Sequence, residues 1–370
     1  MKIICLQSDL AKGVNIVSKA VPTRTTMPIL ECILITASEK GITLTANDTE
    51  LGIETNLVGK AVEKGMIALD ARIFSEIVRK LPDSEVVIET DETHRALITC
   101  EKAKFNIAGY SGEEFTLLPQ IEKEEKVTLS EFTLKEVIRQ TIFSVADNEN
   151  NKMMTGELFE INENRLRVAS LDGHRISIRN IELKENYGQI KVIVPGKALQ
   201  EISRILPGEV EELVDLYFTN NHVLFEFGET KVVSRLIDGE YFHIDQMLSA
   251  DYETKVKINK KEFTDCIDRA TLLVREGDKK PVILNVEDGY LELRINSFIG
   301  SMDEEIEIEK EGKDLMIGFN PKFLMDALRA IEEEEVTLYM VNAKTPCFIR
   351  DEGDSYIYLI LPVNFNAASV

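Results

Sequence analysis

The chain has 370 residues, of which 44% are hydrophobic and 29% charged, and 65 acidic residues against 43 basic ones give a formal net charge of −22. A chain of this length is expected to form two or three domains, and its apolar runs are too short for a membrane helix of ~18 residues or for a signal peptide. Five scattered cysteines without C-x-x-C spacing argue against a disulfide framework or a zinc site and favour a reducing cytoplasm.

The first third of the chain begins with a short strand and an amphipathic helix within Met1–Val21, where Leu10, Val14 and Val17 form the apolar face. A second strand, turn and amphipathic helix occupy Ile67–Pro82. Alternating strands are predicted around these helices, at Ile29–Thr36, Gly41–Ala46, Leu51–Val58 and Ser84–Phe105, with a further hairpin to Leu118.

The same order of elements returns twice along the chain. Met1–Val21 aligns without gaps to Glu125–Val145 and to Thr254–Val274, and Ile67–Pro82 corresponds to Val192–Pro207 and Ile317–Glu332. The later strands are predicted at Glu157–Ile161, Arg165–Ser170, Ile176–Leu183 and Glu212–Ile237 in the second copy, and at Val282–Val286, Tyr290–Ile295, Met302–Ile308 and Val336–Leu361 in the third.

These copies define three domains, at residues 1–122, 126–250 and 254–370. Short turns such as Glu39-Lys40-Gly41, Asn162-Glu163-Asn164 and Glu287-Asp288-Gly289 separate successive strands, which favours antiparallel sheets. We therefore predict an α+β fold of three tandem domains, each with two helices on antiparallel sheets.

Basic residues recur at two positions, seven residues apart, on the second helix of every copy: Arg72 and Arg79, Lys197 and Arg204, Lys322 and Arg329. At about 100° per residue, seven residues nearly return to the starting angle, so each pair forms one stripe opposite the apolar face. A solvated face would explain one such pair, whereas three pairs favour a shared role. Glu76, Glu201 and Asp326, four residues after the first cation, predict that part of the stripe is self-paired.

Four stretches of the chain resemble the bacterial DNA polymerase III beta subunit family, the sliding clamps: Arg24–Leu30 (RTTMPIL), Ser170–Ile176 (SLDGHRI), Ser234–Gly239 (SRLIDG) and Leu359–Val363 (LILPV). The resemblance covers the whole chain. It implies a head-to-tail homodimeric ring of six similar clamp domains, with helices around the hole and sheets outside. It also implies a non-catalytic processivity subunit of a DNA-directed DNA polymerase, without cofactor or metal, in the cytoplasm at the nucleoid.

Helix packing supports a two-chain ring independently of the resemblance. Helices pack about 10 Å apart, so six of them in a ring leave a hole of only ~9 Å, whereas twelve leave roughly 28 Å. A B-form duplex is about 20 Å across. A ring around duplex DNA therefore needs two chains of this kind, and heterologous contacts allow such closed assemblies.

In such a ring the six stripe residues would face phosphates, together with Lys12, Lys19 and Arg139 on the first helices, because sliding requires attraction without sequence readout. The excess acid does not exclude this, since charge must be judged by its distribution. The resemblance implies a further DNA contact at Arg24. It also implies a second contact loop at Asp147–Met154, where the aromatic residues of some relatives are missing and Lys152 is the candidate.

The resemblance implies a second site, a hydrophobic cleft between the second and third domains. The cleft would bind a short linear motif carried by the replicative polymerase alpha subunit, the clamp loader, translesion polymerases, mismatch-repair proteins and ligase. Apolar walls with a few polar groups suit peptide capture. By position, the cleft residues are Met154, Leu171, Gly173, His174, Arg175, Ile176, Phe242, Met247, Phe323, Pro346, Leu359, Ile360, Leu361, Pro362 and Val363.

The sequence departs from the family pattern around this cleft. Phe242 stands where proline is common, Gln246 where a basic residue is common and Asn364 where an arginine is usual, and the tail Phe365–Val370 is longer than usual. These departures bear on the preferred motif more than on the existence of the site.

The ring contact implied by the resemblance joins the first domain of one chain to the third domain of the other. Phe105 and Ile107, on a late strand of the first domain, would meet Leu272 and Leu273 of the partner subunit. Each of these four residues is also compatible with an ordinary hydrophobic core.

Two other classes of function stay open. Asp172 and His174 would serve a metal-dependent hydrolase, although no nucleophile or third ligand accompanies them; turnover abolished by His174→Ala would favour this class. A repeat scaffold that binds proteins but no DNA would capture peptides without staying on a circular duplex.

Overall fold

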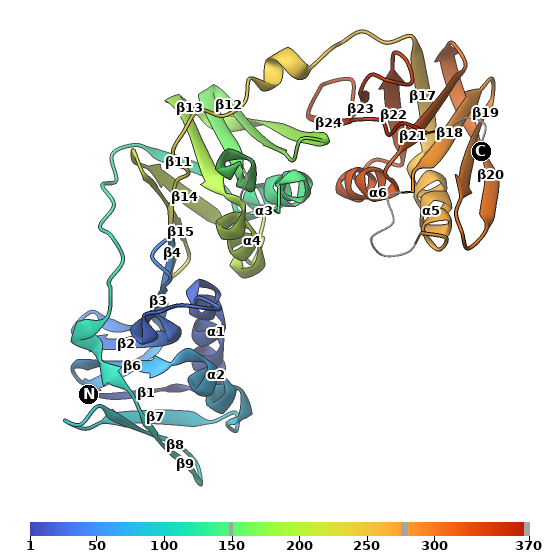
Figure 1. Cartoon of the computed structure of the whole chain (residues 1–370). Helices are drawn as coiled ribbons and strands as arrows, with labels where there is room; N and C mark the ends of the chain where they lie inside the picture. Colours follow the sequence, from blue (N-terminus) through green and yellow to red (C-terminus); the bar gives the residue numbers. More distant parts are fainter. Residues whose placement is uncertain (148–150, 275–279, 366–370) are drawn as a thin grey trace. The chain divides into compact units, whose positions relative to one another are not determined.

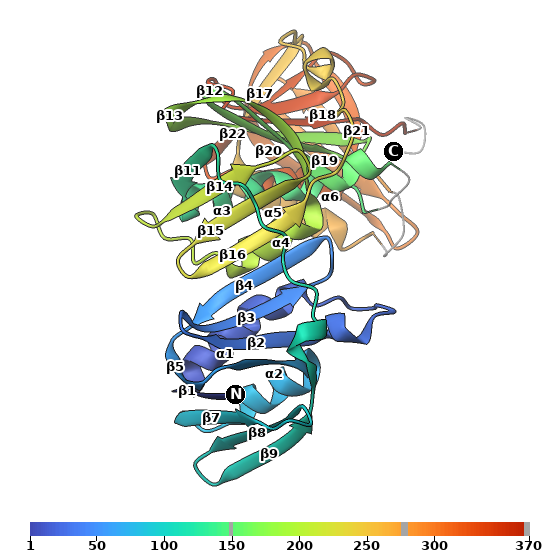
Figure 2. The ribbon, with the colours of Figure 1, turned by 90° about the vertical axis from the view of Figure 1, so that its left-hand side faces the viewer.

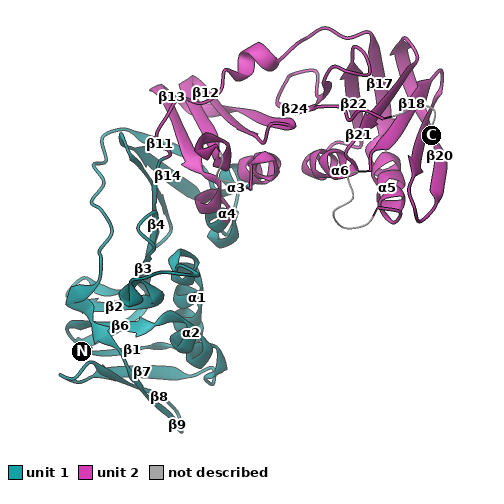
Figure 3. Ribbon diagram, viewed as in Figure 1, with its two compact units in different colours: residues 1–135, 201–236 teal, residues 136–200, 237–370 magenta. Residues whose placement is uncertain are grey.

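The computed structural model describes residues 1–147, 151–274 and 280–365. The chain divides into two compact units, of which the first contains residues 1–135 and 201–236 and the second residues 136–200 and 237–370 (Figure 3). Every strand pair within the described residues is antiparallel, as the short turns predicted. Within the same residues, no helix is long and apolar enough to cross a membrane.

The first unit contains two helices that pack on each other, α1 (Gln7–Val17) and α2 (Ala71–Lys80) (Figure 1). Its sheets have the strand orders β5-β1-β7-β8-β9 and β10-β6-β2-β3-β4-β16-β15-β14-β11. The strands are β1 (Lys2–Leu6), β2 (Cys32–Ser38), β3 (Gly41–Asn47), β4 (Leu51–Leu57), β5 (Gly59–Glu63), β6 (Gly65–Asp70), β7 (Glu85–Thr90), β8 (Arg95–Cys100), β9 (Ala103–Ala108), β10 (Tyr110–Ser111), β11 (Lys126–Ser130), β14 (Leu213–Phe218), β15 (His222–Phe227) and β16 (Thr230–Arg235).

The second unit repeats this plan, with α5 (Lys260–Thr271) packed on α6 (Pro321–Ala330). Its single sheet has the order β12-β13-β24-β23-β22-β17-β20-β19-β18-β21. The strands are β12 (Gly156–Leu171), β13 (Arg175–Pro195), β17 (Thr254–Asn259), β18 (Val282–Glu287), β19 (Tyr290–Asn296), β20 (Ser301–Gly312), β21 (Leu315–Phe319), β22 (Glu335–Met340), β23 (Cys347–Arg350) and β24 (Tyr356–Ile360). Helices α3 (Glu131–Thr141) and α4 (Gly196–Ile205) have residues in both units.

The core lies between the helices and the sheets. On α5 and α6, Phe263, Ile267 and Leu324 are fully buried against strand residues, at the positions that the 3.6-residue period placed on the apolar face. Phe74 on α2 and Leu10 on α1 are likewise fully buried. All five cysteines are free and buried, so they behave as small apolar core residues.

Continuous sheets connect successive sequence repeats. Strand β4, from the first repeat, pairs with β16 of the second, and β13 of the second repeat pairs with β24 of the third. The predicted domains follow the sequence repeat, whereas the two compact units follow these shared sheets and therefore divide the middle repeat. Strand β9 is the last strand of the five-stranded sheet: it pairs with β8 on one side, and no strand of the described residues pairs with its other side, as Figure 2 shows.

Two strands are longer than the sequence predicted. The segment Asn162-Glu163-Asn164 does not end a strand, because β12 continues through it as a bulge in its pairing with β13, with Glu163 at a φ of 53°. The residues that predicted a turn form this bulge instead, because asparagine-rich segments tolerate the same backbone conformation in bulges as in turns. At Gly41, by contrast, the predicted turn is present, with a φ of 122° that favours glycine.

Candidate functional site

The stripe on α2 is exposed to solvent. Asp70 caps the helix by accepting a hydrogen bond from the Ile73 amide at 2.8 Å, and the apolar face is buried. Arg72 is exposed, and the side chain of Arg79 is 70% exposed although it donates to both oxygens of Glu76, at 2.6 and 2.7 Å. Such an exposed pair contributes little to stability and leaves the cation accessible.

The other two stripe helices present the same positions. Lys197 and Arg204 on α4 are exposed, and Arg204 donates to Glu201 at 2.5 Å. On α6, Lys322 and Arg329 are exposed as well. The predicted self-pairing is confirmed on α2 and α4. On α6 it is replaced, because Asp326 binds Arg175 instead.

The remaining predicted DNA contacts differ in exposure. Lys12, Arg24 and Lys152 are exposed, whereas Lys19 is half-buried. Lys152 begins a short 3-10 helix, Lys152–Thr155. The loop Asp147–Met154 lies partly outside the described residues, because positions 148–150 are among those that the structure does not describe.

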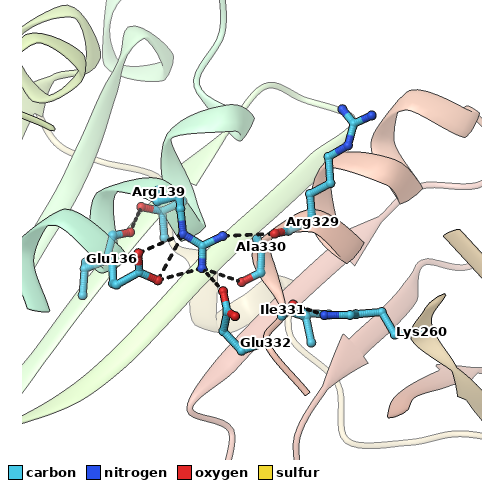
Figure 4. Close-up of polar contacts among 9 residues, drawn as sticks. Glu136, Arg139, Lys260, Arg329, Ala330, Ile331 and Glu332 are labelled. Carbon is cyan, nitrogen blue, oxygen red and sulfur yellow. Dashed lines mark hydrogen bonds and ion pairs between the residues drawn. The ribbon is translucent and has the colours of Figure 1, made fainter. Parts of the chain in front are cut away.

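Arg139 is not presented like the stripe residues. Its side chain is only 35% exposed and donates to Glu136, to the carbonyl oxygens of Arg329 and Ala330 at 3.0 and 3.4 Å, and to Glu332 at 2.5 Å (Figure 4). The hydrogen bonds to Glu136 and the neighbouring carboxylates raise the pKa of Arg139. Its cation thus caps the C-terminal end of α6, a favourable place for positive charge, and we leave it out of the duplex contacts proposed below.

A buried arginine organises the predicted cleft. The side chain of Arg175 is 7% exposed, and its guanidinium donates to Asp172 at 2.9 Å, to Asp326 at 2.7 Å and to the carbonyl of Phe143. The same group lies 4.4 Å from the centre of the Phe323 ring. A buried charge is tolerated only when it is paired and hydrogen-bonded, so these contacts tie the turn before β13 to helix α6.

Two cavities are both lined by the His174–Phe323 pair, whose ring centres are 6.1 Å apart. The larger one, of about 970 Å³, includes His174, Phe323, Leu361, Pro362 and Val363 of the predicted cleft. It extends over α5 and α6 to residues that sequence reasoning missed: Asp268, Thr271, Val274, Lys280, Pro281, Asn320, Pro321, Met325 and Asp326, besides the stripe residues Lys322 and Arg329.

The other predicted cleft residues lie apart from this cavity. Leu171, Ile176 and Leu359 are at most 5% exposed and pack in one apolar cluster, with Met154 and Phe242 partly buried against it. Ile360 is buried in the core of the third repeat. Gly173 forms the tip of the turn with a φ of 86°, Met247 is 43% exposed and Pro346 is half-buried. The buried members therefore belong to the core and do not line this cavity.

Asp172 and His174 do not form a reactive pair. One oxygen of Asp172 accepts from the backbone amides of His174 and Arg175, at 3.0 and 3.2 Å, and the other from the Arg175 side chain. This carboxylate serves the turn and the buried arginine. In the described part of the chain, no three histidine, cysteine or acidic side chains gather as metal ligands would.

The four residues of the predicted ring contact are accessible to different degrees. Phe105, on the edge strand β9, is 37% exposed and Ile107 is half-buried; Leu272 is 78% exposed and Leu273 packs partly on the core. The turn between β19 and β20 adds Phe298, which is 93% exposed. A large apolar residue so exposed usually marks a contact surface when others surround it.

Comparison with known proteins gives one consistent result. Three family models match the chain: the N-terminal, central and C-terminal domains of the DNA polymerase III beta subunit, at residues 1–119, 128–243 and 245–364. A curated beta sliding clamp from Staphylococcus aureus is 37% identical over 356 residues, which cover 93% of this chain and 94% of the relative.

Solved structures agree with these matches. A crystal structure described as a putative DNA polymerase III beta subunit from Eubacterium rectale is 69% identical, with a TM-score of 0.96, and covers 99% of this chain and 100% of that one. The DNA polymerase sliding clamp from Bacillus subtilis is 36% identical, with a TM-score of 0.95 and the same coverage.

Proposed function

The chain belongs to the DNA polymerase III beta subunit family, the non-catalytic sliding clamps, and on that premise we propose how its residues hold duplex DNA, close a ring and recruit partners. The observation that carries the proposal is the stripe: six exposed cations stand at the same two positions of α2, α4 and α6. The proposed duplex contacts are Arg72, Arg79, Lys197, Arg204, Lys322 and Arg329, with Lys12, Arg24 and Lys152.

These cations suit a contact that slides. Lysine and arginine near the DNA backbone attract phosphates without distinguishing sequences. Because the chain as a whole carries a formal charge of −22, attraction is confined to these basic positions and opposed elsewhere. A duplex would then be held weakly at many equivalent positions, which allows diffusion along the DNA.

The strand pairing favours closure by a second copy. Inside the chain, β4 of the first repeat pairs with β16, the last strand of the second repeat. In the same way, β13 of the second repeat pairs with β24, the last strand of the third. By the same alignment, the third repeat offers the first half of β20, and the last strand of the first repeat is the free edge β9. A head-to-tail pair of chains would join these two strands and cover Phe105, Leu272 and Phe298.

The cavity beside Phe323 is the proposed peptide site. Its wall combines apolar residues, among them Phe323, Leu361 and Val363, with polar and charged ones that include His174, Lys322 and Asp326. This combination fits a short motif with large apolar side chains and a few polar groups. The partners that such motifs would bring are the replicative polymerase, the clamp loader, translesion polymerases, mismatch-repair proteins and ligase. They would meet the clamp on DNA, in the cytoplasm at the nucleoid.

Sedimentation velocity with a fluorescent peptide tests the assembly and the recruitment together. Without any partner, the protein should sediment as a dimer of twice the chain mass of 41.8 kDa. A labelled C-terminal peptide of the replicative polymerase from the same organism should co-sediment with it. Phe323→Ala should weaken the peptide complex at least tenfold. Phe132→Ala, which removes a 47% exposed aromatic ring from α3, is the matched control and should change nothing. A monomer at micromolar concentration, or peptide binding that ignores Phe323, would refute the proposal.

A further inference from the structure

We propose that Asp268 fixes the closing contact between two copies of the chain by pairing with the end of the partner's helix α2. The inference rests on the proposed ring and adds a residue-level rule for which surfaces may meet. It begins from Arg139, which occupies the equivalent position of the second repeat and whose contacts the structure shows in full (Figure 4).

Arg139 joins the second repeat to the third at one defined place. Its guanidinium, on the last turn of α3, reaches the final carbonyl oxygens of α6 and the carboxylate of Glu332 that follows. Arg329 contributes only its backbone to this contact, while its own guanidinium points away (Figure 4). A cation therefore stands where one repeat meets the end of the second helix of the next repeat, and the local charge on that end is negative.

The sequence repeat transfers this geometry to the ring contact. The gapless alignment of Glu125–Val145 with Thr254–Val274 places Asp268 at the position of Arg139. The alignment of the second helices places Arg79 and Lys80 at the positions of Arg329 and Ala330. If β20 of one copy pairs with β9 of another as β13 pairs with β24, Asp268 stands beside the last turn of the partner's α2.

The charges at this second junction are reversed and complementary. The last turn of α2 carries Arg79 and Lys80, with side chains 70% and 73% exposed, and Asp268 is exposed near the end of α5. Within the residues that the structure describes, Asp268 makes no ion pair of its own, whereas Arg139 already binds two carboxylates. The first repeat has the neutral Asn15 at this position. Each junction thus carries its own charge pattern.

This reversal gives the assembly a direction. Backbone carbonyls at the end of either helix repel Asp268. On a partner's α6 the carboxylate of Glu332 adds to this repulsion, whereas on α2 the cations Arg79 and Lys80 offset it. Electrostatic complementarity of this kind selects partners and suppresses wrong pairings more than it adds affinity. The third repeat would therefore bind the first repeat of another copy in preference to a second third repeat.

Charge reversal with rescue tests the inference. Asp268→Lys and Lys80→Glu should each raise the dimer dissociation constant at least tenfold, measured by sedimentation velocity over a concentration series, and the double variant should return to within about threefold of the wild type. Glu262→Lys makes the same change of charge in the first turn of α5 and should leave dimerisation unchanged. Melting curves of all variants identify any that fail to fold.

The outcomes separate this inference from the proposed function. If the wild-type chain dimerises and the two single reversals leave the dissociation constant unaltered, Asp268 does not fix the contact. Reversals that weaken the dimer without mutual rescue would likewise overturn the pairing with Lys80. A wild-type chain that stays monomeric throughout would instead refute the ring itself.

Discussion

The guanidinium of Arg175 lies 2.7 Å from the carboxylate of Asp326, and both side chains are largely withdrawn from solvent, at 7% and 17% exposure. The two residues are 151 positions apart in the sequence and belong to the second and third repeats. Their contact therefore joins two domains beside the proposed peptide cavity, which both Asp326 and His174 line.

Loss of this contact should destabilise the second unit. Arg175→Ala leaves Asp172 and Asp326 near one another without their shared cation, and breaking a buried pair costs about 3–5 kcal/mol. Urea unfolding should show that decrease. Lys261→Ala removes an exposed pair with Asp265 and should cost less than about 1 kcal/mol. Equal effects of the two variants would mean that Arg175 is not a structural hub.

The stripe should determine the salt dependence of DNA binding. Each contributing cation releases roughly one counterion, so Arg72→Ala, Lys322→Ala or Arg329→Ala should each reduce the slope of log affinity against log salt by about 1. Fluorescence anisotropy of a labelled duplex over a salt series measures this slope. Lys40→Ala, in the turn between β2 and β3, is a charge-matched control that should keep the wild-type slope. Stripe variants that behave like Lys40→Ala would exclude these helices from the DNA contact.

A buried carboxyl should make the fold less stable as pH rises toward about 8. Burial raises the pKa of Glu157 from 4.5 to about 8, and the neighbouring Thr141 hydroxyl offsets the shift only in part. The folded state then holds a proton that the unfolded state has lost, so this group reduces stability as pH rises from about 4.5 to about 8, by about 1.4 kcal/mol per pH unit.

Melting temperatures at pH 6 and pH 9 test this dependence. Glu157→Gln keeps a neutral polar side chain at the site and should flatten the decline between the two values. Glu160→Gln, three residues along the same strand and partly exposed, should not. If the melting temperature of Glu157→Gln declines as steeply as that of the wild type, the loss of stability with rising pH arises elsewhere.

The register of the ring contact can be tested with cysteine pairs. Val233 faces Gly52 inside the chain, and the repeat places Asn106 and Ser301 at the equivalent positions of β9 and β20. Asn106→Cys and Ser301→Cys in one chain should therefore form disulfide-linked dimers on oxidation, while the five native cysteines stay buried. Moving the second cysteine to Asp303, two residues along the strand, should reduce cross-linking strongly. The opposite preference would show a shifted register.

Much of the fold was predictable because the chain repeats its pattern three times. The helical period placed Phe74, Leu324 and Phe263 in the core, and glycine-containing turns such as the one at Gly41 fixed strand ends. The continuous strands β12 and β13 were not predicted, because a bulge and a turn share the same residue types, as at Glu163.

The site was predictable in outline and less so in detail. The helical period correctly predicted that the stripe residues are exposed to solvent. It could not predict that Arg139 contacts the end of α6, because that contact joins residues about 190 positions apart. The family resemblance predicted that Leu171 and Ile176 line the cleft, whereas both side chains are buried within their strands. The reach of the cavity to Asp268 and Lys280 depends on tertiary packing that no local pattern encodes.

Encirclement of DNA is the central claim, and topological trapping measures it most directly. The Asn106→Cys, Ser301→Cys chain is oxidised in the presence of nicked circular duplex and passed over a sizing column in high salt, which removes electrostatic binding. Cross-linked protein should co-elute with the circle and be released when a restriction enzyme linearises it. Protein that separates from the intact circle, or that remains bound after linearisation, would contradict a ring that closes around the duplex.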